Sequence, residues 1–259
     1  FLENNNLSDV IFEDKEYNHV LEAFRTARLS EQLRNNLRKY LQVMTKPLAV
    51  RSSGLFEDSL NQPFAGVYST YLLPNNHPDI ERRLEDVENA IKLVFASIYS
   101  PESRAYFNAI DYMIEEEKMA VILQEVVGNE HNGRYYPEIS GVAQSYNFYP
   151  FSYIKPEDGF AVTAIGLGAY VVGGEKTHRF SPAYPKLQLA STQDKIKASQ
   201  RYFYGVNMLA QDYDLYRDGE NAAIKAYDIS EAERDGTLEY TASVYDFMND
   251  QITYDFSFK

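Results

Sequence analysis

Two segments have the apolar spacing of amphipathic helices. In the first, apolar residues recur over 33–44, Ser30 is placed to cap the helix, and the helix should end before Pro47. In the second, an apolar face runs over 80–98, with Pro78 in a first-turn position. The opposite face of this second helix is charged, so packing of its apolar face must hold it in place.

Strand patterns alternate with these helices. The apolar run 48–50 leads into the polar residues 51–54, and 66–73 is rich in β-branched and aromatic residues. The nearly continuous apolar run 119–127 predicts a strand that is buried on both faces.

The second half of the chain gives weaker patterns. Runs typical of strands occupy 140–143 and 160–165, and the latter leads into Gly166-Leu167-Gly168. Residues 196–208 have a pattern compatible with a helix, whereas the acidic residues from 228 to 259 predict no definite element.

Composition limits the classes of function. The 259 residues carry a formal net charge of −13, which disfavours binding to nucleic acid or to an anionic membrane surface. The chain has no cysteine, which excludes disulfides, thiolate catalysis and cysteine-bound metals. No apolar run reaches the roughly 20 residues of a membrane span. We therefore expect a cytoplasmic protein in which a local cationic site holds any phosphate-bearing ligand.

Arg51 is the first candidate for such a site. It directly follows the apolar residues 48–50, so its guanidinium would lie near the end of a strand, where open sheets present ligand groups. A guanidinium stays charged and donates hydrogen bonds in a fixed fork that suits phosphate. The alternative, which local chemistry alone favours, is an ion pair with Glu57 or Asp58.

Two further groups of residues have chemistry that suits a nucleotide. Gly166-Leu167-Gly168 and Gly173-Gly174 allow backbone amides to approach an anion closely, although a structural turn is the simpler explanation for this spacing. Gln124 and Glu125 interrupt an apolar strand and could present amide, carbonyl or carboxylate groups to a purine. The alternative is a polar pair that is satisfied within the core.

Several sequence blocks occur in the order found in one enzyme family. Val50-Arg51-Ser52-Ser53, Glu57-Asp58 and Phe64-Ala65-Gly66, with Thr70 shortly after, resemble the opening of the nucleotide-binding domain of the phosphoenolpyruvate synthase and pyruvate phosphate dikinase family. Later blocks of that family follow in order at residues 121–127, 140–143, 166–168 and 171–174. The resemblance covers residues 47–175, and an ordered set of blocks is poorly explained by chance.

The resemblance implies an ATP-grasp fold, in which ATP lies between two α+β lobes and Mg²⁺ bridges its phosphates. Family members use this site to phosphorylate a histidine on a separate domain, and the phosphoryl group then passes to pyruvate on a pyruvate-binding domain. ATP and Mg²⁺ are therefore the implied ligands, and these other domains are the implied partners. The Mg²⁺ ligands cannot be identified in the sequence.

The resemblance also implies which residues bind ATP. Arg51 would contact the phosphates and take part in catalysis. The loop over the phosphates would include Gly66, Thr70 and Tyr71, and the hinge strand that receives adenine would include Gln124, Glu125 and Val127.

The sequence departs from the family pattern in ways that indicate a fragment. Ala169 stands where members usually have an acidic residue after Gly-Leu-Gly. The upstream glycine motif with its lysine, the acidic Mg²⁺ ligands and the threonine-rich phosphohistidine motif are not found. A longer parent chain explains these absences together, with 1–46 as a helical lead-in, 47–118 as a first lobe and 119–259 as a second lobe that is cut short.

Three functions remain open at this point. The leading hypothesis is the ATP-binding portion of a phosphotransferase whose acceptor is pyruvate, a portion that would not complete turnover by itself. The alternative is a non-catalytic nucleotide-binding regulatory module, which Ala169 favours. The third is a structural protein without a nucleotide site. A phosphohistidine motif in the parent would favour the first, and failure of the parent to bind any nucleotide would favour the third.

Overall fold

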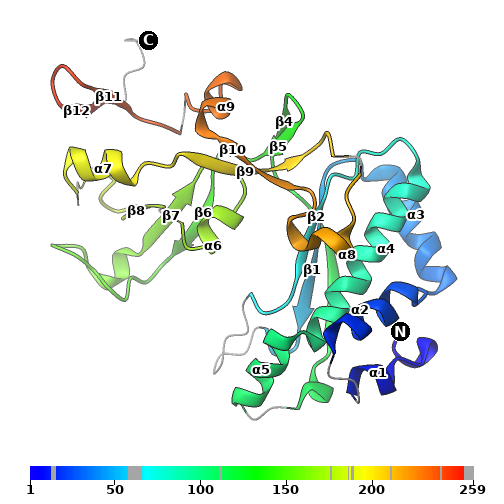
Figure 1. Cartoon of the computed structure of the whole chain (residues 1–259). Helices are drawn as coiled ribbons and strands as arrows, with labels where there is room; N and C mark the ends of the chain where they lie inside the picture. The colour runs from blue at the N-terminus through cyan, green and yellow to red at the C-terminus, as the bar shows by residue number, and fades with distance from the viewer. Residues whose placement is uncertain are drawn as a thin grey trace. The chain divides into compact units, whose positions relative to one another are not determined.

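The chain folds into two compact units. The structure is a computed structural model that describes residues 1–12, 16–57, 66–110, 113–175, 177–185, 187, 190–210, 212–239 and 241–253. Unit 1 comprises Phe1–Val126 with Val206–Ile224, and unit 2 comprises Val127–Gly205 with Lys225–Lys259 (Figure 1). No helix in the described part of the chain has the length and apolar character needed to cross a membrane.

Helices make up much of unit 1. The two helices predicted from periodicity are confirmed as α3 (Glu31–Val43) and α4 (Ile80–Ala96). Ser30 caps α3 by accepting a hydrogen bond from the Leu33 amide at 3.3 Å, as its position in the sequence predicts. The remaining helical elements of unit 1 are η1 (Glu3–Asn5), α1 (Ser8–Phe12), α2 (Tyr17–Thr26), η2 (Ser97–Tyr99), α5 (Pro101–Ile110), η3 (Ile114–Glu116), α8 (Leu215–Asp218) and η5 (Gly219–Asn221).

A three-stranded antiparallel sheet completes unit 1. The central strand β1 (Leu48–Gly54) pairs with β2 (Thr70–Leu73) on one side and with β3 (Met119–Glu125) on the other. The strand predicted over 66–73 is confirmed only in its second half, because residues 66–69 form a turn and a bend before β2 begins. β3 begins where the second ATP-grasp lobe was predicted to begin, and the lobe boundaries stay a prediction.

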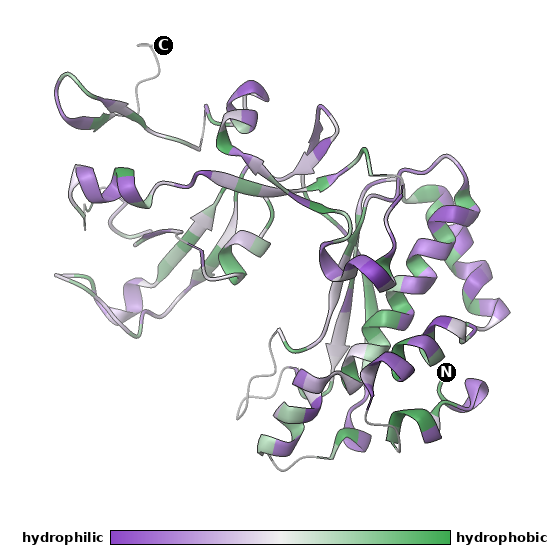
Figure 2. Ribbon diagram, in the orientation of Figure 1, coloured by the Kyte–Doolittle hydropathy of each residue, from purple (hydrophilic) through white to green (hydrophobic). Residues whose placement is uncertain are grey.

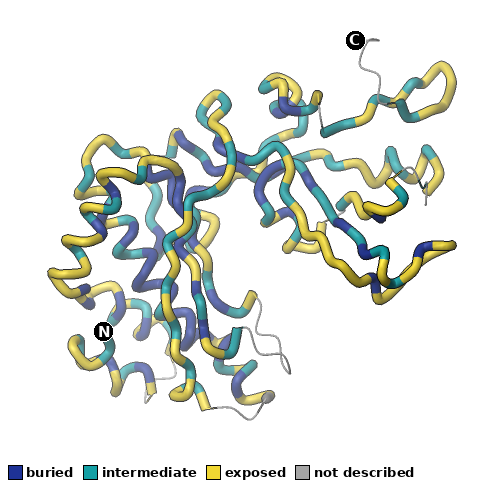
Figure 3. Tube along the Cα trace, turned by 180° about the vertical axis from the view of Figure 1, so that it is seen from behind, coloured by how far each residue is buried: buried dark blue, intermediate teal, exposed yellow. Residues whose placement is uncertain are grey.

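Helix α4 covers one face of this sheet. Leu48, Val50 and Leu73 are buried with Leu84 and Val87 of α4 in a common hydrophobic core. Fully burying an aliphatic side chain of this kind stabilises the fold by about 1.5–3 kcal/mol. Hydrophobic residues run along α4 and the neighbouring strands (Figure 2), and buried residues concentrate on the same elements (Figure 3).

The other face of the sheet carries exposed side chains. The prediction that β3 is buried on both faces is wrong, because its residues alternate between half-buried and exposed. Met119, Val121 and Leu123 pack against the core of unit 1, whereas Ile122 and Gln124 are exposed. An apolar run in sequence therefore does not require two covered faces.

Unit 2 contains small antiparallel sheets and short helices. The strands predicted at 140–143 and 160–165 are confirmed as β6 (Ser140–Gln144) and β7 (Phe160–Ala164), which form a sheet in the order β6-β7-β8 with β8 (His178–Phe180). The other strands are β4 (Asn129–His131), β5 (Arg134–Tyr136), β9 (Tyr202–Asn207), β10 (Ile224–Asp228), β11 (Val244–Asp246) and β12 (Gln251–Thr253). The helices are η4 (Pro156–Asp158), α6 (Ala169–Val172), α7 (Thr192–Ala198) and α9 (Ile229–Arg234).

The helix predicted over 196–208 is wrong. Helix α7 ends at Ala198, and the chain then forms β9, which lies between β10 and β5 in its sheet. Residues 202–206 are aromatic and β-branched apart from one glycine, a composition that favours a strand. Phe203 is fully buried against Tyr136, with ring centroids 4.5 Å apart. Side-chain packing in this sheet therefore outweighs the helical spacing.

A buried ion-pair cluster joins the region after α9 to the hairpin of β4 and β5. The Asp235 carboxylate, whose side chain is fully buried, accepts hydrogen bonds from Arg134 Nη2 at 2.6 Å and from Asn132 Nδ2 at 2.9 Å. Tyr136 Oη donates to the same carboxylate at 2.8 Å. The cluster thus links segments about a hundred residues apart in the sequence.

Candidate nucleotide-binding face

The open face of the unit 1 sheet brings together three of the predicted site residues. Side chains alternate across a strand, so Arg51 lies on the face opposite to buried Val50. Arg51 is paired in register with Thr70 of β2 and with Ile122 of β3, and directly opposite residues share a face. Gln124 lies in the next row, opposite Ala49. The side chains of Arg51, Thr70 and Gln124 are all exposed.

The Arg51 guanidinium has no hydrogen bond or ion pair within the described residues. Glu57, one of the two partners considered for it, instead accepts from Ser52 Oγ at 3.2 Å and from the Gly54 amide at 3.0 Å. Asp58, the other, lies outside the described residues. The donors of Arg51 thus face solvent and are available to an anion.

Gln124 and Glu125 have different environments at the end of β3. The alternative that they form a polar pair satisfied within the core is wrong, because Gln124 is exposed and Glu125 is only half-buried. Glu125 forms an ion pair with Lys46 at 2.6 Å. The Gln124 amide group makes no side-chain hydrogen bond in the described part of the chain. Gln124 is therefore the better placed of the two to contact a ligand.

Tyr71 does not share this face, and Gly66 and Val127 lie outside the strands of the sheet. Tyr71 is 6% exposed and belongs to the hydrophobic core, so strand alternation directs its side chain away from the face of Thr70. Gly66 precedes β2 with φ of +79°, a conformation that favours glycine. Val127 is 78% exposed and is the first residue of unit 2. The roles of Gly66 and Val127 remain predictions.

Sequence reasoning missed Ile122, which is 42% exposed on the open face beside Arg51. The apolar run 119–127 predicts a strand buried on both faces, which hides an exposed residue. The spacing of two residues between Ile122 and Gln124 nevertheless places both side chains on one face. An exposed aliphatic side chain between two polar ones can contact an apolar ring surface. The face thus combines a cation, a hydroxyl, an amide and an apolar side chain.

Comparison with known proteins decides the family. The sequence profile of the family described as "Pyruvate phosphate dikinase, AMP/ATP-binding domain" matches residues 2–236. The chain belongs to this family. The match extends well beyond residues 47–175, over which the resemblance was recognised from individual sequence blocks.

Two curated phosphoenolpyruvate synthases are similar to this AMP/ATP-binding domain. The protein from Aeropyrum pernix is 29% identical over 131 residues, which cover 50% of this chain and 14% of the relative. The protein from Deinococcus radiodurans is 29% identical over 216 residues, which cover 80% of this chain and 24% of the relative. The chain therefore spans a quarter or less of the length of either relative.

The glycine block of this AMP/ATP-binding domain forms a tightly packed turn. Gly166 has φ of +86°, and a Cβ atom there would lie 2.7 Å from the Tyr204 carbonyl oxygen. The following amide, of Leu167, donates to that same oxygen at 2.8 Å. Close packing and the positive φ account for Gly166 without a ligand. Ala169, the departure from the family pattern, is the exposed first residue of α6.

Over the described ranges, no group of three or more His, Asp or Glu side chains is arranged to hold a metal ion. Mg²⁺ prefers near-octahedral oxygen ligands, often one or two carboxylates together with substrate phosphates. The described residues therefore do not supply a complete protein site for Mg²⁺.

Proposed function

We propose that this chain is the ATP-binding part of a phosphoenolpyruvate synthase-like phosphotransferase. In the parent protein, ATP with Mg²⁺ would phosphorylate a histidine on a separate domain, and that histidine would pass the phosphoryl group to pyruvate. Family membership and the two similar phosphoenolpyruvate synthases support this proposal. The observation that carries it is that Arg51, which has no partner among the described residues, lies on an open sheet face beside Thr70 and Gln124. The expected cytoplasmic location is part of the same proposal.

Arg51 and Thr70 would bind the phosphates. Phosphoryl transfer spreads charge over the oxygens of the transferred group, so the protein acts mainly by positioning that group and stabilising its charge. The exposed guanidinium of Arg51 can donate to these oxygens without a change of protonation. The Thr70 hydroxyl lies directly opposite on β2 and can donate to a second oxygen. Gly66 would allow the preceding loop to approach the phosphates closely.

The end of β3 would receive the adenine ring. Gln124 offers both an amide donor and a carbonyl acceptor, which suit the polar edge of a purine. Ile122 would contact the ring surface. Glu125, which forms an ion pair with Lys46, would fix the position of the end of β3. Val127, two residues further along the chain, would lie beside the adenine ring. Side-chain alternation along β3 supports the contacts proposed for Gln124 and Ile122, whereas that of Val127 rests on the family resemblance.

Replacing Gln124 by alanine should weaken ATP binding roughly 2- to 10-fold, the scale of one neutral hydrogen bond. Binding of inorganic triphosphate, which has no base, should not change. Isothermal titration of both ligands measures the difference. Gln144→Ala, which removes an exposed glutamine from β6, is the matched control. An equal loss for ATP and triphosphate would contradict the adenine assignment.

A non-catalytic regulatory module is the second candidate. The observation in its favour is Ala169, which places a methyl group at the exposed start of α6 where family members usually have an acidic side chain. The two candidates differ in whether the parent protein transfers phosphate. Incubation of the parent with radiolabelled ATP, followed by a test for acid-labile phosphohistidine, separates them. ATP binding without any labelled histidine would favour the regulatory module.

A further inference from the structure

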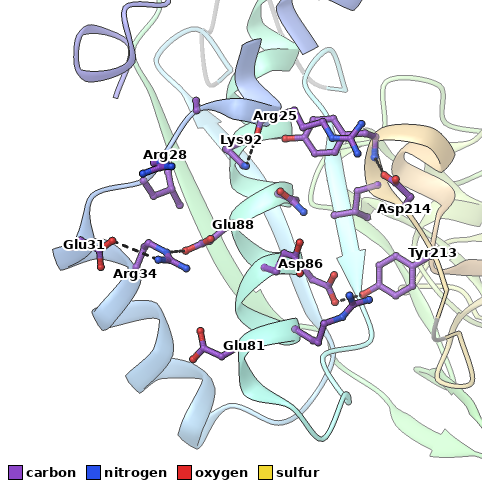
Figure 4. A pocket seen from close by; sticks show the side chains of 17 residues that line it. Arg25, Arg28, Glu31, Arg34, Glu81, Asp86, Glu88, Lys92, Tyr213 and Asp214 are labelled. Carbon is purple, nitrogen blue, oxygen red and sulfur yellow. Dashed lines mark hydrogen bonds and ion pairs between the residues drawn. The ribbon is translucent and has the colours of Figure 1, made fainter. Parts of the chain in front are cut away.

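A charged cleft of about 740 Å³ lies on the helical side of unit 1. Its floor is the face of α4 that points away from the sheet, and its walls are the connection between α2 and α3 and the residues 213–216 at the start of α8. Figure 4 shows charged side chains from these elements around the cleft. Because the apolar face of α4 packs on the sheet, this cleft and the open face with Arg51 lie on opposite sides of the sheet.

Most carboxylates of the cleft already have cationic or hydrogen-bonding partners. Glu88 and Glu31 both form ion pairs with Arg34 of α3. Glu81 accepts hydrogen bonds from Arg38 at 2.7 and 3.0 Å. These pairs tie α3 to α4 and engage all three carboxylates, and the two arginines leave one negative charge in excess.

The remaining carboxylates lie nearer to α8. Asp86 accepts a hydrogen bond from Tyr213 Oη at 2.8 Å. Asp214 caps α8 by accepting from the Tyr216 amide at 2.9 Å. Among the residues that the structure describes, Glu85 is the one lining carboxylate that forms no hydrogen bond or ion pair. The acidic groups of the cleft are thus almost all engaged.

The cations at one end of the cleft form no ion pair in the described ranges, although the charges of Glu88 and Glu85 act on Lys92. Lys92 is 8% exposed, and its Nζ donates to the Arg25 carbonyl oxygen at 2.9 Å, which leaves its other N–H groups available. Burial lowers the pKa of Lys92 and the charges of Glu88 and Glu85 act against this shift, so further negative charge beside the ammonium group would be stabilising. The Arg25 guanidinium lies over the Tyr216 ring, 5.3 Å from its centroid. Arg28 is exposed, and Figure 4 shows it at the same end of α4 as Arg25 and Lys92.

A second observation points to a missing partner at this end. Tyr216 Oη is buried and has no hydrogen-bond partner within the described part of the chain. Buried hydroxyl groups are nearly always hydrogen-bonded, so such a group indicates a site for a water or a ligand atom. Tyr216 lines the cleft directly beneath Arg25.

We propose that this end of the cleft binds a phosphate or carboxylate group of a small anionic ligand, with Arg25, Arg28 and Lys92 as donors. Among the described lining residues, the guanidinium groups of Arg25 and Arg28 outnumber the one carboxylate without a hydrogen bond or ion pair, that of Glu85. Arginine provides a fork for two oxygens and lysine a point charge, a combination that suits either oxyanion. The cleft volume lies within the range of about 300–1,000 Å³ that is typical of small-molecule sites. The site is independent of the proposed nucleotide face.

Isothermal titration with pyrophosphate and with citrate tests the proposal. Every protein in the test carries Arg51→Ala, so that an anion bound on the open sheet face does not contribute. At constant ionic strength, we expect saturable binding of at least one anion, and the tighter of the two identifies the ligand class. Adding Arg28→Gln should weaken that binding about 10-fold or more, the scale of a charged hydrogen bond. Arg28 is exposed, so the folded state should be retained.

Two further variants test whether an unpaired carboxylate opposes anion binding and whether the loss of binding is specific to arginines of the cleft. Glu85→Gln removes the unpaired carboxylate and should tighten anion binding, whereas a purely structural role of the cleft predicts no such gain. Arg201→Gln removes an exposed arginine of unit 2 and should leave binding unchanged. The proposal is overturned if neither anion binds saturably, or if Arg201→Gln weakens binding as much as Arg28→Gln does.

Discussion

Replacing Asp235 by alanine should destabilise unit 2 by about 3–5 kcal/mol, because the substitution leaves a buried guanidinium without its carboxylate. The Arg134 side chain is 13% exposed and that of Asp235 is fully buried. Among the described residues, Arg134 would keep only Glu231, at 3.1 Å, as an anionic partner. Asn132 and Tyr136 would also lose an acceptor. Urea unfolding followed by far-UV circular dichroism at neutral pH measures the loss.

An exposed ion pair provides the control for this experiment. Arg38→Ala breaks the pair with Glu81 on the surface of unit 1 and should cost much less stability than Asp235→Ala, because solvent screens an exposed pair. If Asp235→Ala costs no more than Arg38→Ala, the cluster does not hold the α9 region to the hairpin in the manner described.

The Asp235 cluster also gives unit 2 a defined dependence on pH. Burial opposes ionisation of Asp235, but hydrogen bonds from Arg134, Asn132 and Tyr136 outweigh it and hold the pKa of the carboxyl below its ordinary value. A depressed pKa stabilises the folded state above the unfolded pKa of about 3.9, and this contribution is lost as pH falls through the folded pKa. The difference in stability between wild type and Asp235→Ala should therefore shrink in acid.

Replacing Arg51 by alanine should weaken ATP binding by about 1.5–3 kcal/mol, or roughly 10- to 150-fold. The substitution removes a charged donor that has no partner in the described residues, so it should not reduce the free energy of unfolding. Isothermal titration of wild type and variant with Mg-ATP measures the effect. Unchanged affinity would remove Arg51 from the site.

Arg51→Lys refines this prediction. Lysine keeps the positive charge but loses the planar fork, so its affinity for ATP should lie between those of wild type and Arg51→Ala. Arg201→Ala, which removes an exposed arginine of unit 2, should bind ATP as tightly as wild type. A lysine variant no better than alanine would indicate that geometry, more than charge, determines the contact.

The elements with local signals could be predicted from the sequence. Helix α3 follows from the cap at Ser30 and from apolar spacing, and α4 follows from its apolar face. The wrong helix prediction over 196–208 has a cause in the local sequence. Ile196 of α7 and the buried Phe203 of β9 are spaced as apolar residues on one face of a helix would be, although they belong to different elements. The Arg134–Asp235 pair could not be predicted, because it joins residues far apart in a chain rich in both charges.

The candidate site could be predicted in part. The strand order β2-β1-β3 brings Arg51, Thr70 and Gln124 onto one face of the sheet. The apolar and polar pattern of a single strand does not determine that order. The alternation of side chains along β2 could be predicted from the sequence, and it places Tyr71 and Thr70 on opposite faces of the strand. The anion cleft could not be predicted, because its character depends on which carboxylates find partners on other helices.

Thermal unfolding of this chain with and without Mg-ATP tests the central claim most directly. A ligand at about 100 times its dissociation constant stabilises the folded state by about 2.7 kcal/mol, which for a chain of this size raises the unfolding temperature by roughly 5–10 °C. We expect that increase for the wild type and its loss in Arg51→Ala. No increase at saturating Mg-ATP, or the same increase in both proteins, would contradict an ATP site on the open face of the unit 1 sheet.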